Sequence, residues 1–453
     1  MKRRDLLKAA SAAAGALAIS PLMARASDVP AEIPQEVDVL VVGGGTAGSI
    51  AALQAARAGA KTMLLEMGSQ LGGTTTTGGV NFPGLFHAWG KQVIAGIGWD
   101  LVEKAVELDS GTMPDFTRTD LRHSALQVRI NGQLYAALLE EACLDAGVSL
   151  AYYQFPLAVE PAGKGWKVDV VGKGVRYPLA CKQLIDCTGG ADVVGMLGLA
   201  RLREETIQPG TFTFRLGDYD VKQLDAQEIQ RRYRKALDEG ELEEGDYSHA
   251  GGSFMGFLGG GGKNAQHVFG ADSSTAVTKT QTNIAGRRSI LRLLRFVRSL
   301  PGCENARVLE MMQETAVRET YRIEGETVIT CDDYTSGRLF DDAVCYAFYP
   351  VDLHDKHGVK PQPLQPGTVP TIPLSALIPK GSRNLLVAGR CVSSDRLANS
   401  ALRVQAPCMA MGQAAGAAAA LAAAANTTPM KVPLAQVRSV LREHGAIVPG
   451  NEG

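Results

Sequence analysis

Short apolar runs and alanine-rich stretches alternate near the start of the chain, with glycine between them. Residues 37–42 are mostly Val and Leu, a composition typical of a buried parallel strand. Residues 49–58 are rich in alanine and predict a helix that ends before Gly59, and residues 61–65 predict a second strand. Strand, glycine-rich loop, helix and strand in this order predict a βαβ unit.

The same kind of pattern predicts elements farther along the chain. The next expected elements are two helices and two strands, at residues 127–146, 401–424, 148–159 and 166–171. Residues 406–425 carry no charge but consist mainly of Ala, Gly and Met, so we expect a buried helix rather than a membrane span. The glycine-rich residues 251–262 predict either a mobile lid or a surface loop. The proline-rich residues 360–373 predict an extended linker.

The glycine loop that begins at Gly43 fits the dinucleotide-binding pattern G-x-G-x-x-G, between a strand and a helix. Glycine allows a tight turn and lets a phosphate approach the backbone, and the helix N-terminus offers amide donors. Glu66, at the end of the second strand, is placed to accept hydrogen bonds from ribose hydroxyls. The dinucleotide contacts predicted in this loop and the first helical turn are Gly43, Gly45, Thr46, Ala47 and Gly48.

Three features favour FAD over NAD as the dinucleotide. A Gly-Gly-Thr loop follows Glu66 and resembles the flavoprotein continuation toward the flavin ring. Residues 184–192 resemble the second flavoprotein motif, with Cys187 in an alanine position, and residues 384–390 resemble the third. The helix after the third motif would aim its N-terminus at the flavin, with Arg403 near its start. The cofactor contacts that this resemblance adds are Gly72, Gly73, Thr74, Thr188, Gly189, Gly389, Arg390, Arg403 and Val404.

These motifs together resemble the FAD-dependent oxidoreductase family of two-dinucleotide-binding-domain flavoproteins, which is related to the flavin-binding part of heterodisulfide reductase. The resemblance runs through residues 41–84, 186–195, 318–354 and 384–416. It implies an α/β fold with a discontinuous Rossmann-like FAD-binding domain of the glutathione-reductase type and an inserted α+β substrate or cap domain. The implied layout is an FAD-binding domain, a cap domain, and a C-terminal helix and tail, at residues 35–200 plus 376–430, 201–375, and 431–453.

No metal is expected beside FAD. The heterodisulfide reductase relative binds iron–sulfur clusters through closely spaced cysteines, whereas the eight cysteines of this chain show no such spacing and are expected to be buried thiols. In related flavoproteins of the succinate dehydrogenase type, a histidine near the Gly-Gly loop links FAD covalently. Residues 74–77 of this chain are all threonine, so FAD is expected to bind noncovalently.

The first 26 residues resemble a twin-arginine export signal. Arg3 and Arg4 lie in a basic start, residues 9–23 carry no charge, and residues 24–26 (Ala-Arg-Ala) offer a cleavage site between small residues. The uncharged run is too short to span a bilayer, so no stable membrane insertion is expected after cleavage. We therefore expect a periplasmic or otherwise exported protein that uses the Tat export machinery. The alternative is an ordinary secretory signal or a retained anchor.

Composition adds two points. The 453 residues carry a net charge of −1, so a basic surface for nucleic acid is not expected. The 51 glycines exceed the usual share of about 7%, and they gather in the predicted cofactor loops and in residues 251–270. This placement indicates backbone that lies close to a ligand in the first group and leaves the second group open.

Oxidation of an alcohol or an amine by a flavin needs a base that takes up a proton. His354 is the first candidate, because histidine titrates near neutrality and Asp352 lies two residues before it, on the same side of a strand. His87, which lies beyond the Gly-Gly-Thr loop, is the alternative base. Arg403 is a third catalytic candidate, as a contact to flavin or substrate, with a structural ion pair as the alternative.

Arginines supply the candidate substrate ligands. Arg318 and Arg322, four residues apart, would share a helical face and bind a carboxylate or another polar group of the substrate, with Asp352 nearby. Internal ion pairs are the alternative for both arginines. Asp395 and Arg396 stand where many family members carry Thr-His, so no family-wide catalytic role is carried over to that position.

The combined prediction is an exported FAD-dependent oxidoreductase. It would dehydrogenate a small polar substrate (an alcohol, sugar, hydroxy acid or amine) by hydride transfer to flavin N5, and then reduce an unknown electron acceptor. One alternative is a flavin-dependent eliminase or isomerase with no net redox change. The other is a non-enzymatic flavin electron-transfer protein.

Overall fold

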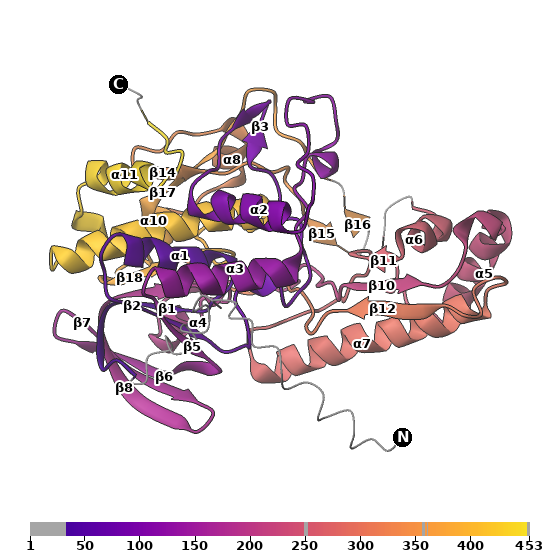
Figure 1. The fold of residues 1–453 in the computed structure, drawn as a ribbon, viewed down its shortest axis with the longest axis horizontal. Coiled ribbons are helices and arrows are strands. Elements are labelled where there is room, and N and C mark those ends of the chain that lie inside the picture. The colour runs from indigo at the N-terminus through magenta and orange to yellow at the C-terminus, as the bar shows by residue number, and fades with distance from the viewer. Residues whose placement is uncertain (1–32, 249–251, 356–357, 360, 451–453) are drawn as a thin grey trace, which may run out of the picture. The chain divides into compact units, whose positions relative to one another are not determined.

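The computed structural model describes residues 33–248, 252–355, 358–359 and 361–450 (Figure 1). The predicted export signal, residues 1–26, lies outside the described residues, as does Gly251 at the start of the predicted lid. The chain from Pro34 onward belongs to one unit.

A seven-stranded sheet forms the centre of this unit. Its strand order is β5-β2-β1-β8-β7-β6, and β18 pairs with the last residues of β8. Strands β5, β2, β1, β8 and β18 are parallel, whereas β6 and β7 run antiparallel to their neighbours. The strands are β1 (Glu36–Val42), β2 (Thr62–Glu66), β5 (Ser149–Tyr152), β6 (Gln154–Ala162), β7 (Gly165–Gly172), β8 (Val175–Asp186) and β18 (Leu385–Val387). The fold is the predicted Rossmann-like α/β fold.

The predicted βαβ unit is confirmed. Strand β1 is followed by helix α1 (Thr46–Arg57) and then by β2, close to the predicted bounds. Val42, the last residue of β1, pairs with Leu65 of β2 and with Asp186 of β8, and Asp186 also pairs with Val387 of β18. The carboxyl ends of β1, β8 and β18 therefore lie together at one edge of the sheet, where ligands bind in open α/β sheets.

Helix α10 (Gln405–Ala424), yellow in Figure 1, packs along α1, which is indigo. Glycine permits this close contact: a Cβ added at Gly412 would lie 2.2 Å from the carbonyl oxygen of Ala47, and one at Gly416 would lie 2.4 Å from that of Ala51. Among the described helices, α10 is the one whose length and hydropathy would suffice to cross a membrane, and 89% of its most apolar window is buried within the protein. This burial is expected of a core helix.

The predicted helix over residues 401–424 is divided in the structure. Helix α9 (Arg396–Leu402) ends at Arg403, and α10 begins after Val404, whose backbone is extended with a ψ of 148°. Pro407 explains the start of α10, because proline has no amide hydrogen and is tolerated only in the first turn of a helix. A single helix over 401–424 was therefore a wrong prediction.

Two other predicted elements differ in extent. The helix predicted at 127–146 is α3 (Gly132–Asp145), which begins where the Asn131 side chain accepts hydrogen bonds from the amides of Gln133 and Leu134. Residues 127–131 are not helical. The strand predicted at 148–159 is two strands, β5 and β6, because Tyr153 between them has a φ of 59° and turns the chain. The strand predicted at 166–171 corresponds to β7.

A second hydrophobic core lies in the segment between Phe212 and Ala306. It is built on a three-stranded sheet of order β11-β10-β12 and on three helices. These elements are β10 (Phe214–Gly217), β11 (Gly262–Lys263), β12 (Arg307–Met311), α5 (Ala226–Asp238), α6 (Phe254–Gly260) and α7 (Ala276–Ser299). The glycine-rich lid or loop predicted at 251–262 is wrong over α6, because Phe254, Phe257 and Leu258 share one helical face and are buried.

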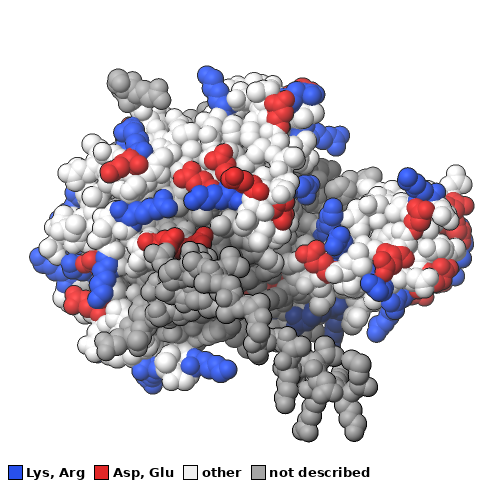
Figure 2. All heavy atoms as spheres, viewed as in Figure 1, with Lys and Arg blue, Asp and Glu red and all other residues white. Residues whose placement is uncertain are grey.

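Four further α-helices and four pairs of short strands are present among the described residues. They are α2 (Ile97–Leu108), α4 (Asp192–Met196), α8 (Cys331–Ser336), α11 (Leu434–Glu443), and the strand pairs β3 (His87–Ala88) with β4 (Lys91–Gln92), β9 (Arg201–Leu202) with β13 (Arg322–Ile323), β14 (Ala343–Tyr346) with β17 (Thr371–Pro373), and β15 (His354–Asp355) with β16 (Gly358–Val359). Of the linker predicted at 360–373, the last three residues form β17. Seven of the eight free cysteines are buried, as predicted, and Cys331 is half-buried. Basic and acidic side chains are intermixed over the face seen in Figure 2.

Candidate functional site

The loops after β1, β8 and β18 meet at the carboxyl edge of the sheet. Gly43, with a φ of 96°, turns so closely over the end of β8 that an added Cβ would lie 2.7 Å from the carbonyl oxygen of Cys187. Gly389, after β18, has a φ of 100°, and an added Cβ would lie 3.2 Å from the Ala47 side chain. Both positions lie in the left-handed region that glycine adopts at no steric cost. The three predicted motifs therefore form one continuous site.

The N-terminus of α1 faces open space. Gly45 is its N-cap residue, no side chain caps the helix, and a Cβ added at Gly45 would meet no atom within 4 Å. The Gly-Gly-Thr loop runs alongside: the amide of Gly72 donates to the carbonyl of Gly44 at 2.8 Å, and a Cβ at Gly73 would lie 3.0 Å from the Gly45 Cα. Thr46, Ala47 and Gly48 form the first turn of α1, while Gly73 and Thr74 begin the short 3-10 helix η1 (Gly73–Thr75). Two glycine loops thus flank an uncapped helix end.

Glu66 holds the dinucleotide loop from the end of β2. Its two carboxylate oxygens accept hydrogen bonds from the amides of Gly44 at 2.7 Å and Gly68 at 2.6 Å. Burial raises the pKa of Glu66, although both amide bonds oppose that rise. Each carboxylate oxygen has a second lone pair, so Glu66 can still accept hydrogen bonds from a ligand.

A chain of side-chain hydrogen bonds joins the start of α1 to the start of α10. The hydroxyls of Thr46 and Thr75 lie 3.1 Å apart, and the Thr75 hydroxyl donates to the Gln405 side-chain carbonyl at 2.6 Å. The Gln405 amide nitrogen donates in turn to the carbonyl of Val80 at 2.7 Å. Val404, the N-cap residue of α10, lies against Gly84. These hydrogen bonds therefore connect the first predicted cofactor segment, at the start of α1, with the last one, at the start of α10.

The second and third motifs are fastened to each other by Arg390. Its Nε donates to the carbonyl of Gly189 at 2.7 Å and its Nη1 to the carbonyl of Val317 at 2.5 Å. Thr188 is held through its amide and hydroxyl by the buried carboxylate of Asp186, whose pKa burial raises. Arg390 therefore orders the loop after β8 through backbone carbonyls.

The structure brings four predicted residues into one polar cluster. We call Gln208, His267, Arg318, Asp352, His354 and Arg403 the Arg–His–Asp cluster. The Nε2 atom of His354 lies 3.1 Å from the Oδ2 atom of Asp352, and its Nδ1 atom lies 3.0 Å from the Nε2 atom of His267. Burial and the nearby Arg318 guanidinium lower the pKa of His354 to about 4. His354 is therefore neutral at pH 7.

Two arginines approach Asp352 from different parts of the chain. Arg403, at the end of α9, donates from Nη2 to the carbonyl of Asp352 and to the side-chain oxygen of Gln208, both at 3.2 Å, and Nη2 lies 3.9 Å from the Asp352 carboxylate. Arg318 donates to the carbonyl of Pro209 at 2.7 Å. Burial and the Arg403 charge lower the pKa of Arg318 to about 9, so it stays protonated at pH 7. Burial opposes ionisation of Asp352, but the His354 hydrogen bond and both guanidiniums hold its pKa below the ordinary value.

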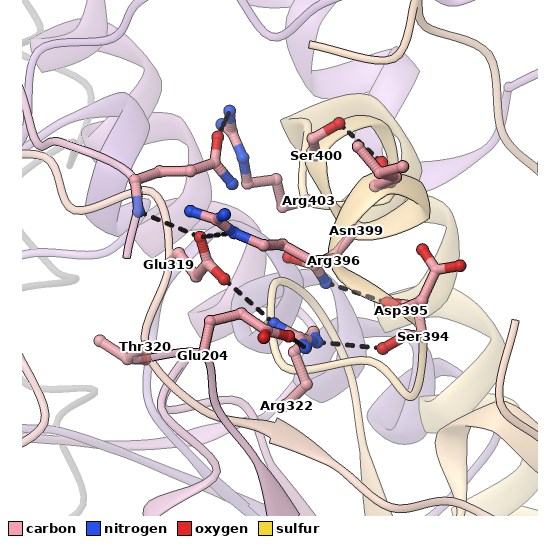
Figure 3. A network of polar contacts seen from close by, with 12 residues as sticks. Glu204, Glu319, Thr320, Arg322, Ser394, Asp395, Arg396, Asn399, Ser400 and Arg403 are labelled. Atoms are coloured by element: carbon pink, nitrogen blue, oxygen red, sulfur yellow. Dashed lines mark hydrogen bonds and ion pairs between the residues drawn. The ribbon is translucent and has the colours of Figure 1, made fainter. Parts of the chain in front are cut away.

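An ion network centred on the buried side chains of Glu319 and Arg322 adjoins this cluster (Figure 3). The Glu319 carboxylate accepts from Arg322 at 3.1 Å, from Arg396 at 3.3 Å and from the backbone amide of Gln208 at 3.1 Å. Arg322 also pairs with Glu204 at 2.7 Å. Arg322 is therefore an internal ion-pair residue, which the sequence left as an alternative.

The predicted helical face shared by Arg318 and Arg322 is wrong. Arg318 lies in a loop, and Arg322 lies in β13, which pairs with β9. The two side chains take different partners, because residues 318–322 do not form the helix that would bring positions four apart together.

The family model for FAD dependent oxidoreductases matches residues 38–441. The chain belongs to the FAD-dependent oxidoreductase family. FAD is accordingly its cofactor, and the protein is a flavoenzyme. No curated protein matches the chain.

Several solved structures resemble the chain at low identity. A geranylgeranyl bacteriochlorophyll reductase-like protein from Thermoplasma acidophilum is 14% identical, covering 90% of this chain and 84% of that chain with a TM-score of 0.44. CabE, an aromatic hydroxylase from angucycline biosynthesis, is 13% identical, with coverages of 90% and 65% and a TM-score of 0.43. The flavin-dependent monooxygenase PieE, solved with FAD and substrate, is 18% identical, with coverages of 40% and 35% and a TM-score of 0.29. The chain thus spans 65% of CabE and 35% of PieE.

The residues at the sheet edge fit FAD. The open space before Gly45 and the uncapped amides of α1 suit a pyrophosphate, which needs close backbone and donors without competing partners. The carboxylate of Glu66 keeps lone pairs for the ribose hydroxyls. The loop of Gly72 and Gly73 continues from the α1 end toward Gln405 at the start of α10, the direction in which the flavin end is expected.

His87 lies in different surroundings from the other candidate base. Its ring stacks on Phe116 with centroids 3.8 Å apart and an interplanar angle of 2°, and Trp99 packs against its edge. Burial lowers the pKa of His87. The structure does not bring His87 together with the Arg–His–Asp cluster.

Sequence reasoning missed three residues that the structure places at the site. Gln208 and His267 complete the Arg–His–Asp cluster, and Gln405 joins the two helix starts. His267 had a weak signal, since the chain has only 7 histidines. Gln208 and Gln405 had none, because their contacts join residues 195 and 330 positions apart.

Proposed function

We propose that this flavoenzyme dehydrogenates a small polar substrate, an alcohol, sugar, hydroxy acid or amine, at the Arg–His–Asp cluster. The observation that carries the proposal is that hydrogen bonds join the Arg–His–Asp cluster to the cofactor loops. Arg403 of the cluster precedes Gln405 by two residues, and Gln405 is hydrogen-bonded through Thr75 to Thr46 at the dinucleotide loop. A substrate held by the cluster therefore lies beside the cofactor loops.

The chain would hold FAD noncovalently through the three motif loops. The phosphates belong at the α1 N-terminus after Gly45, and the ribose belongs at Glu66. Bound FAD supplies a flavin ring that takes a hydride at N5. The N-terminus of α10 and Arg403 add positive potential at the cluster, which favours negative charge on a neighbouring ligand.

The cluster supplies a proton acceptor. Asp352 is ionised and His354 is neutral at pH 7, so His354 carries its proton on Nε2, where it donates to Asp352. The lone pair of His354 is then on Nδ1, and the Nε2–H of His267 donates to it. Nδ1 can take up a proton only when this hydrogen bond opens, and His354 would then become an imidazolium that is paired with Asp352. Asp352 thus fixes the tautomer and stabilises the protonated ring.

We propose further that the protein is exported by the Tat machinery to the periplasm, with no stable membrane insertion after its signal is removed. The twin Arg3-Arg4 pair, the uncharged residues 9–23 and the small-residue cleavage site support this. An enzyme that binds FAD before export suits a route for folded proteins. Its partners would be a small-molecule substrate and an electron acceptor, with no nucleic acid.

Anaerobic reduction of the bound FAD tests the proposed reaction. Purified holoenzyme is mixed with sugars, alcohols, hydroxy acids and amines, and loss of flavin absorbance is followed at about 450 nm. We expect one class to bleach the flavin, and we expect His354→Gln to slow that reduction about 100-fold or more while His87→Gln leaves it nearly unchanged.

Three results would contradict the proposal. The first is a flavin that no tested class bleaches. The second is a rate that depends on His87 and not on His354. The third is steady product formation without an acceptor, which would instead support an eliminase or isomerase.

A further inference from the structure

Among the described residues, the charges of the Arg–His–Asp cluster and its supporting network do not balance. In the supporting network, Arg322 and Arg396 are matched by Glu319 and Glu204. The cluster itself contains two guanidiniums, those of Arg318 and Arg403, and one carboxylate, that of Asp352. His354 adds no charge at pH 7, so the cluster carries one unmatched positive charge.

The cluster also holds two buried hydrogen-bond donors for which the described residues provide no acceptor. The Nε of Arg403 and the Nε2 of Gln208 are both buried without a hydrogen-bond partner. Gln208 uses its side-chain oxygen to accept from Arg403 and from the backbone amide of His354, which leaves its amide nitrogen directed elsewhere. Buried donors without acceptors are costly unless a ligand completes them.

The side chains of Asp352, His354 and Arg403 keep 14%, 12% and 12% of their surface exposed, so a small ligand can reach the cluster. The cluster thus has an unmatched positive charge, two buried hydrogen-bond donors without acceptors, and partly exposed side chains. These three features are expected of a binding site for a small anion. Guanidinium groups form their strongest hydrogen bonds with carboxylates, which also fit the fork of their donors.

We propose that Arg318 and Arg403 bind the carboxylate of the substrate, and that the substrate is therefore a hydroxy acid. This inference rests on the proposed dehydrogenase function and selects one of its four substrate classes. A neutral alcohol or sugar would leave the positive charge unmatched. An amine would bring a second positive charge to it, because amines are protonated at neutral pH.

Oxidation of a hydroxy acid by FAD balances in atoms and electrons. Once the hydrogen bond from His267 opens, the hydroxyl group would lose its proton to Nδ1 of His354, the carbon would lose its hydrogen as a hydride to FAD, and a carbon–oxygen double bond would form. The hydroxy acid leaves as an oxo acid, oxidised by two electrons, and FAD is reduced by two. The bound carboxylate also neutralises the guanidiniums that lower the pKa of His354, so it makes His354 a stronger base. A substrate that carries this anion would thus activate the proton acceptor that it needs.

Binding of matched acids and amides tests the inference without turnover. Holoenzyme is titrated with propionate and with propionamide, which differ in charge but not in carbon skeleton and carry no hydroxyl to oxidise. Binding is read from the change in the visible spectrum of bound FAD and from the shift in melting temperature. We expect propionate to bind at least about tenfold more tightly than propionamide, as a charge-assisted contact requires.

Arg318→Gln is the informative variant, because glutamine keeps an amide donor but has no charge. We expect it to abolish the preference for propionate. Arg438→Gln is the matched control: Arg438 also donates to a backbone carbonyl, that of Ala343, but lies in α11. It should keep the preference.

Equal binding of propionate and propionamide by the wild-type holoenzyme overturns the inference, and so does an unchanged preference in Arg318→Gln. The wild-type comparison stands even if the variant fails to fold. Failure of the two proposals can be told apart. A preference for propionate with no hydroxy acid able to bleach the flavin supports the carboxylate site and contradicts the dehydrogenase. Bleaching of the flavin by neutral alcohols, with no preference for propionate, supports the dehydrogenase and contradicts the carboxylate site.

Discussion

We expect Gly412→Ala to weaken both the fold and FAD binding, because Gly412 lies where α10 crosses α1. The added methyl group would lie 2.2 Å from the carbonyl oxygen of Ala47, whereas ordinary van der Waals contacts begin at 3.4 Å. The helices must therefore separate locally by about 1.2 Å, since a backbone oxygen cannot rotate away as a side chain can. At Gly416, one turn later, an added Cβ would lie 2.4 Å from the carbonyl oxygen of Ala51, so separating the helices would also open this second close contact.

The expected magnitude follows from two opposing effects. Overpacking of a rigid interior costs about 1–3 kcal/mol, and the upper end applies to a backbone partner. Replacing glycine by alanine inside a helix returns up to about 1 kcal/mol. The free energy of unfolding should therefore fall by about 2 kcal/mol. Because Ala47 belongs to the first turn of α1, the phosphate-binding amides move with it, and FAD affinity should fall about tenfold or more.

Gly259→Ala provides the control. Gly259 lies in α6, and a Cβ there would meet nothing within 4 Å. The same chemical change should leave stability unchanged or raise it by up to about 1 kcal/mol, with FAD affinity unaltered. Urea unfolding of both holoenzymes and equilibrium FAD titration of both apoproteins provide the comparison. If Gly412→Ala matches the wild type in stability and FAD affinity, the packing argument is wrong.

Between about pH 4 and 6.5 the unfolded chain binds more protons at His354 than the folded chain, because burial and Arg318 lower its folded pKa to about 4. Its contribution to stability should be complete above pH 6.5 and disappear as the pH falls toward 4, and urea unfolding should show that His354→Gln flattens this slope. Acid precipitation should release all the flavin into the supernatant; yellow colour in the pellet would indicate a covalent link. Replacing Arg3 and Arg4 together by lysine should remove the protein from the periplasmic fraction, whereas Lys8→Arg should not; an unchanged distribution would exclude the Tat route.

The cofactor half of the site was predictable because its signals are local. The strand, loop and helix around Gly43 follow one another directly, and Glu66 lies within the same βαβ unit. The parallel pairing of β1, β8 and β18 then brings their three loops together, since motifs at the ends of parallel strands share one edge. The start of α10 was also readable from Pro407, although the continuous alanine pattern concealed it.

The substrate half was only partly predictable. His354 and Asp352 were found from residue type and spacing, and their contact is observed. Their partners come from distant segments: Gln208 and His267 precede His354 by 146 and 87 positions. Hydrophobic periodicity carries no information about such contacts, because it reports only which face of an element is buried. The four-residue spacing of Arg318 and Arg322 misled for the same reason, since spacing has meaning only once the element is known.

The hydrogen bonds from Thr46 through Thr75 to Gln405 have a consequence for the order of events in the cell. They join a residue near the start of the chain to one near its end, and β18 and α10 complete the same edge. A ribosome that has made only the βαβ unit has not yet made the residues that close the site over FAD. FAD can therefore be bound only after synthesis is nearly finished. A chain that stops before α10 would not retain FAD, just as a chain that lacks Gly45 would not.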